Sequence, residues 1–176
     1  MHAAELGTRA PVGVLAAGVA GLAFATHPLG ADAVIAAFLA AVLVVIAAID
    51  IRSLIIPNRI VLPVTAIVLV ANIAMFPDRA TEFLLAAAVA GVVLLLPNLV
   101  GGAIGMGDVK LGLLLGVALG WGVIGALELA CLALFPVALF VLVRGGRQAR
   151  KAALPFGPFM AFGALFVMIV PRLAAW

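Results

Sequence analysis

Two aspartates are the residues of this sequence best suited to chemistry. Asp50 ends one long apolar run and Asp108 begins another, in a chain that is 68% hydrophobic and only 10% charged. A carboxylate at the edge of a bilayer is costly unless it is stabilised, so its presence there points to a function. Two carboxylates that meet can share a proton and activate a water molecule. A carboxylate-pair hydrolase needs that arrangement.

The composition indicates a protein that crosses a membrane several times. Mean hydropathy is +1.42, and the charged fraction is far below the roughly 25% of a soluble domain. No polar stretch is long enough to fold separately, so we expect one integral-membrane domain over residues 1–176. The net charge of +3 fits basic loops that hold the cytoplasmic face and contact lipid, so we expect no nucleic-acid partner.

Apolar runs between charges and Pro or Gly breaks predict an all-α membrane bundle of about seven transmembrane helices. They lie at residues 11–27, 31–50, 59–76, 81–99, 108–120, 122–143 and 154–172. A six-helix alternative fuses the two runs around Trp121. One helix over 109–143 would extend about 52 Å at 1.5 Å per residue, against a ~30 Å hydrocarbon core. Seven helices therefore fit better, and the short 108–120 helix should be buried against its neighbours.

The basic residues orient the seven spans. With the N-terminus in the cytoplasm, eight of the ten Lys and Arg residues fall on the inner side: Arg9, Arg52, Arg59, Lys110, Arg144, Arg147, Arg150 and Lys151. Only Arg79 and Arg172 fall outside, whereas six spans would put the Arg144–Lys151 cluster there. Asp50 and Asp108 then lie at one depth near the cytoplasmic face. Their lateral separation is left open.

The first candidate segment runs from Asp50 to Asn58. Pro57 biases Ile56 away from helix, and Asn58 is a good cap for the helix that follows. In the alternative interpretation, Asp50 is only an interfacial charge paired with Arg52 or Arg59.

The second segment, Gly101–Lys110, is rich in glycine. Gly105 and Gly107 permit unusual backbone angles and let another chain come close, as a wall of a peptide-binding cleft requires. The spacing does not match a nucleotide-binding loop. Alternatively, Asp108 is a helix cap in an ordinary turn. Lys110 could bind a lipid phosphate or the substrate, or serve as a plain anchor.

The third segment, Pro155-Phe156-Gly157-Pro158, predicts a rigid turn on the same face, or simply the start of the last helix. The remaining polar residues add little. Glu128 is a lone acid within a helix, and Cys131 reads as a small packing residue. No metal-ligand spacing and no Ser/His/Asp arrangement is present, so we expect no metal.

Together, the three segments resemble the type IV prepilin peptidases, membrane aspartic proteases with a Gly-x-Gly-Asp motif. The likeness lies in Asp50 with Ile56-Pro57-Asn58, in Gly105-Met106-Gly107-Asp108-Val109-Lys110, and in Pro155-Phe156-Gly157-Pro158-Phe159. The resemblance implies that Asp50 and Asp108 are catalytic, in a bacterial inner membrane. It also implies that the substrate is a pilin-like precursor, cut between its short leader and its apolar helix.

The resemblance is to a compact, peptidase-only form, as in Flp pilus and tight-adherence systems. Larger members carry an N-terminal cytoplasmic segment with paired cysteines and methylate the new N-terminus; no counterpart is seen here, so we expect no separate methyltransferase domain and no cofactor. Two other classes stay open: a small ion-coupled transporter using Asp50, Asp108 and Glu128, and a non-catalytic scaffold of a secretion system. The sequence sets no oligomeric state.

Overall fold

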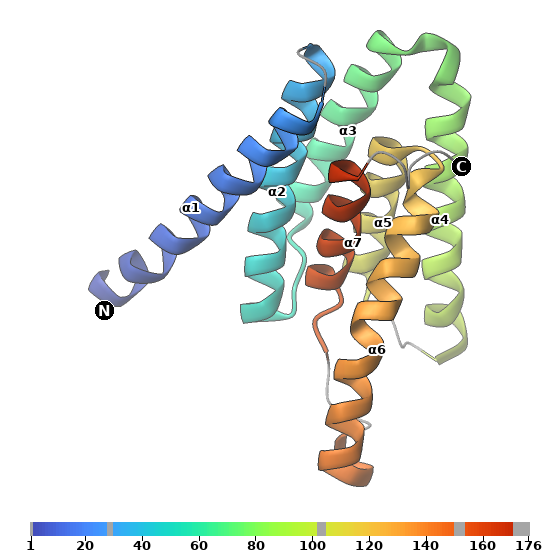
Figure 1. The fold of residues 1–176 in the computed structure, drawn as a ribbon. Helices are drawn as coiled ribbons and strands as arrows, with labels where there is room; N and C mark the ends of the chain where they lie inside the picture. Colours follow the sequence, from blue (N-terminus) through green and yellow to red (C-terminus); the bar gives the residue numbers. More distant parts are fainter. Residues whose placement is uncertain (1, 28–29, 102–104, 150–153, 171–176) are drawn as a thin grey trace.

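The computed structural model describes residues 2–27, 30–101, 105–149 and 154–170, which form a bundle of seven α-helices (Figure 1). Within these ranges there is no strand, so the predicted all-α class is confirmed. The helices are α1 (His2–Thr26), α2 (Ala31–Ser53), α3 (Asn58–Met75), α4 (Ala80–Gly101), α5 (Met106–Leu119), α6 (Gly122–Ala149) and α7 (Gly157–Ile169), with a 3₁₀ turn η1 at Pro77–Arg79.

Each predicted helix is present, and the six-helix alternative is wrong. Gly120 separates α5 from α6 with a φ of +56°, a conformation that suits glycine. The predicted limits were less accurate for four helices, of which α2 continues to Ser53, three residues past its predicted end. α1 and α6 reach further than expected, because strong helix formers such as alanine and arginine continue beyond the apolar runs. α7 begins only after Pro155.

Some predicted features lie outside the described residues. They are residues 102–104 of the glycine-rich segment, Arg150 and Lys151 of the basic cluster, and positions 171–172 at the end of the last predicted span.

Four stretches are long and apolar enough to cross a membrane: Asp32–Ser53, Asn58–Met75, Pro77–Pro97 and Gly122–Arg144. α5 is different, because its 14 residues extend only about 21 Å at 1.5 Å per residue. It contacts α3, α4, α6 and α7 and is the central helix of the bundle. Its buried positions are Val109, Leu111, Gly112, Leu114, Leu115, Gly116 and Val117. The expected burial of this short helix is confirmed.

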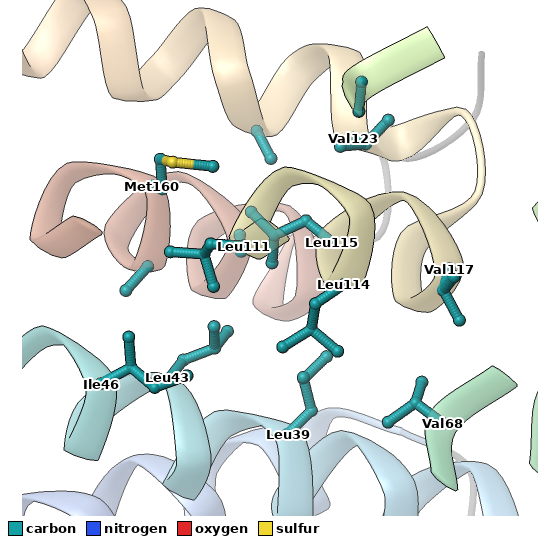
Figure 2. Packing of buried hydrophobic residues seen from close by; sticks show 14 of the residues in the cluster. Leu39, Leu43, Ile46, Val68, Leu111, Leu114, Leu115, Val117, Val123 and Met160 are labelled. Carbon is teal, nitrogen blue, oxygen red and sulfur yellow. The ribbon is translucent and has the colours of Figure 1, made fainter. Parts of the chain in front are cut away.

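The core lies where α2, α5 and α7 meet. Figure 2 shows Leu43 and Ile46 of α2 on one side of this space, Leu111 and Leu114 of α5 within it, and Met160 of α7 nearby. Lipid chains are as apolar as these side chains, so close packing rather than escape from water must hold the helices together. Small residues allow it: Gly116 of α5 lies against the backbone of Ala87 in α4, and a Cβ at position 116 would collide with it.

The helices alternate in direction through the bundle (Figure 1). α2, α4 and α6 end at the lower end in this view, and α3, α5 and α7 begin there. We call this the site end of the bundle. The described residues of all three candidate segments lie at the site end.

Candidate active site

Asp50 lies in the last turn of α2 and is only 4% exposed. The helix ends three residues later, where Leu54 adopts a left-handed conformation with φ 52° and its N–H donates to the carbonyl of Asp50. Pro57 then keeps the chain extended until α3 begins. Asp50 is therefore held on a rigid helix, immediately before an irregular connection.

Asp108 lies in the first turn of α5. Its Oδ2 accepts a hydrogen bond from the backbone N–H of Gly105 at 3.3 Å. A carboxylate is favourable at the positive end of a helix dipole, and it satisfies one of the free N–H groups there. Asp108 therefore does cap the start of α5, as the alternative interpretation predicted. The same side chain is only partly buried and lines a cavity.

The cavity has a volume of about 300 Å³ and lies at the site end between the α2–α3 connection and the start of α5. Both carboxylates line it, and Asp108 lies within electrostatic reach of Asp50. The other lining residues are Leu54, Ile55, Ile56, Asn58, Gly105, Met106, Gly107 and Lys110. The sequence left the lateral separation of the two carboxylates open, and the structure brings both to one cavity.

Gly107 forms a wall of this cavity together with Ile56. A Cβ at position 107 would lie 2.8 Å from the Cβ of Ile56, so only glycine lets the α2–α3 connection approach α5 so closely. The predicted close approach is real. The segment that approaches Gly107 is the α2–α3 connection of the protein itself, whereas the sequence predicted a bound peptide.

Lys110 joins two of the candidate residues. Its Nζ donates a hydrogen bond of 2.8 Å to Oδ1 of Asn58, which ties the start of α5 to the start of α3. The expectation that Asn58 caps α3 through its side chain is wrong. Pro57 precedes the helix, Asn58 is its first residue, and the Asn58 side chain points to Lys110 instead.

Gly157, the first residue of α7, reaches the site from the far end of the chain. Its backbone N–H donates a buried hydrogen bond of 3.0 Å to Oδ2 of Asp50. The Asp50 carboxylate therefore accepts this hydrogen bond from a backbone amide. The alternative interpretation expected a pairing with Arg52 or Arg59 instead. Pro155 and Phe156 lie just before α7, where Phe156 packs against the core, and neither lines the cavity.

A sequence model described as the type IV leader peptidase family matches residues 37–170. The matched range contains Asp50 and Asp108, which line the cavity, and Gly157, which hydrogen-bonds Asp50. The chain belongs to this family. Neither the curated proteins nor the solved structures give a significant match. Membership confirms the resemblance drawn from the three motifs and makes the chain a peptidase, and its long apolar helices are consistent with a place in a membrane.

One other acid and the cysteine of the sequence lie away from this cavity. Glu128 is exposed on α6 and does not line the cavity. Cys131 is also exposed, so its expected role as a packing residue inside the bundle is wrong. In a membrane an apolar surface residue can face lipid as readily as the core, which is why hydropathy misplaced it.

Sequence reasoning missed Leu54, Ile55, Ile56 and Met106 as cavity residues. The signal was present, since each lies within a few positions of a motif residue. It was overlooked because apolar residues within or beside a motif are easily taken for part of a membrane span.

Proposed function

We propose that Asp50 and Asp108 form the catalytic dyad of an aspartic endopeptidase. The observation that supports this is the single cavity lined by both carboxylates at the end of the bundle. Two carboxylates so placed cannot both ionise at ordinary cost, so the pair shares one proton.

The dyad hydrolyses a peptide bond without a covalent enzyme intermediate. The ionised carboxylate takes a proton from a water molecule as the water oxygen attacks the scissile carbonyl carbon. The protonated carboxylate gives its proton to the carbonyl oxygen. When the tetrahedral intermediate breaks, the C–N bond cleaves, the leaving nitrogen takes up a proton from one carboxyl group, and a hydroxyl group of the intermediate returns a proton to the other carboxylate, which restores the singly protonated dyad. One water is consumed, and a carboxylic acid and an amine are formed.

We propose as substrate a pilin-like precursor of the Flp type, cut between a short leader and its apolar helix. The cavity lies at the end of the bundle, so an apolar substrate helix can stay in the membrane while the bond to be cut reaches the dyad. Ile51 and Ile55 beside the site are 62% and 65% exposed and offer an apolar surface for such a helix. The excess of Lys and Arg predicted on this side supports a site at the cytoplasmic face of a bacterial inner membrane.

The transporter alternative is less well supported. It needs acids spread along a path through the bundle, whereas the two leading acids lie at one end and Glu128 lies on an exposed surface of α6. A scaffold would have no use for two carboxylates in one cavity.

A cleavage assay in detergent or liposomes tests the proposal, with a pilin-like precursor as substrate. The unaltered protein should remove the leader, and Asp50→Asn and Asp108→Asn should each abolish cleavage while the protein still inserts and folds. Glu128→Gln is the matched control, since it removes an acid outside the cavity, and it should cleave normally. Normal processing by either aspartate variant would overturn the dyad.

A further inference from the structure

Each carboxylate of the proposed dyad binds one backbone amide through Oδ2. The Gly157 amide donates to Asp50 at 3.0 Å, and the Gly105 amide donates to Asp108 at 3.3 Å. Both amides stand at the beginning of a helix, α7 in the first case and α5 in the second. Among the residues that the structure describes, no donor bonds Oδ1 of either carboxylate. The two Oδ1 atoms are therefore the oxygens left for water and substrate.

The two amides differ in how closely they pack against their carboxylates and in how buried they are. The bond from Gly157 is buried, and a Cβ at position 157 would lie 2.8 Å from Oδ2 and 3.2 Å from Cγ of Asp50. Gly105 is exposed, and a Cβ there would lie 3.3 Å from Oδ2 of Asp108. The backbone of α7 thus lies against Asp50 as closely as a residue without a side chain allows.

We infer that Gly157 is a positioning residue of the active site, an inference that rests on the proposed dyad. Its amide fixes the rotation of the Asp50 carboxylate so that Oδ1 meets the attacking water. Its missing side chain leaves the space in which that carboxylate sits. Gly105 orients Asp108 in the same way but less tightly. A charged acceptor makes amide hydrogen bonds roughly twice as strong as neutral ones, so the Gly157 contact is strong enough to select one orientation.

A graded set of glycine-to-alanine variants tests this role in the precursor-cleavage assay. Gly157→Ala should lower kcat about 100-fold with KM unchanged, because a misplacement of about 1 Å at a reacting group costs that much. Gly105→Ala should lower kcat about tenfold or less, since its added Cβ crowds Asp108 less and in a more exposed place. Gly18→Ala in α1 is the matched control, because nothing lies within 4 Å of the added Cβ, and it should leave both constants unchanged.

A backbone ester separates the amide from the steric effect. Glycolic acid incorporated at position 157 removes the N–H and adds no side chain. We expect a kcat about tenfold lower with KM unchanged, the loss of one hydrogen bond of about 1.5 kcal/mol. Thermal unfolding in detergent shows whether each variant is folded.

The outcomes are distinct from those that test the dyad itself. A folded Gly157→Ala protein with unaltered kcat would overturn the positioning role, as would a change confined to KM. If the alanine variant does not fold, an ester variant with full kcat overturns it. Cleavage by Asp50→Asn, in contrast, would overturn the proposed function, whatever the glycine variants do.

Discussion

Ile56 lies against Gly107 so closely that a Cβ at position 107 would be 2.8 Å from the Cβ of Ile56. The two residues come from different parts of the chain and form one wall of the cavity that Asp50 and Asp108 line. Ile56 is buried, so the branched Cβ of Ile56 has little freedom to move away. The shape of this candidate active-site cavity therefore depends on the contact between Ile56 and Gly107.

The first prediction concerns Gly107→Ala. We expect a drop in kcat/KM of about tenfold or more, because the added methyl group pushes the α2–α3 connection away from α5 and separates the two carboxylates. Ile56→Ala in the same chain creates the missing space and should restore part of the activity. Initial rates of precursor cleavage by both single variants and the double variant measure the coupling between the two positions. Strictly additive losses would mean that the contact does not shape the site.

The sequence predicted the number of helices and that both aspartates lie at the same end of the bundle, because both follow from run length and charge. α2 and α4 are apolar on all sides, so no amphipathic stripe tells which face meets which neighbour. The bond between Gly157 and Asp50 spans 107 residues and depends on that unknown packing. The contact between Ile56 and Gly107 likewise depends on how the helices pack. The end of the bundle at which each aspartate lies can thus be derived from sequence, whereas the lateral arrangement of the site cannot.

The second prediction concerns the bond between Lys110 and Asn58. Lys110→Met keeps most of the side-chain volume but removes the donor that ties α5 to α3 beside the cavity. We expect kcat/KM to fall about threefold to tenfold, as the loss of an exposed hydrogen bond of about 1 kcal/mol implies. Thermal stability should change little, since the bond is at the surface.

Asn58→Ala removes the acceptor of the same bond and is the matched partner variant. If the bond acts as a unit, the double variant should be no worse than Lys110→Met alone. A double variant with the full product of both losses would show that Lys110 acts on the substrate independently of Asn58. Steady-state cleavage kinetics of the three proteins decide between these outcomes.

The third prediction concerns the packing of the central helix. Gly116→Ala places a methyl group against the backbone of Ala87, which cannot rotate away, so α4 and α5 must separate. We expect a loss of about 1–3 kcal/mol in the free energy of unfolding, typical of an overpacked core. Gly91→Ala at the same pair of helices is the matched control, because its added Cβ meets the end of the flexible Leu113 side chain. Its loss should be clearly smaller in denaturant unfolding of the detergent-solubilised protein. Equal losses would mean that backbone contact between α4 and α5 does not limit their approach.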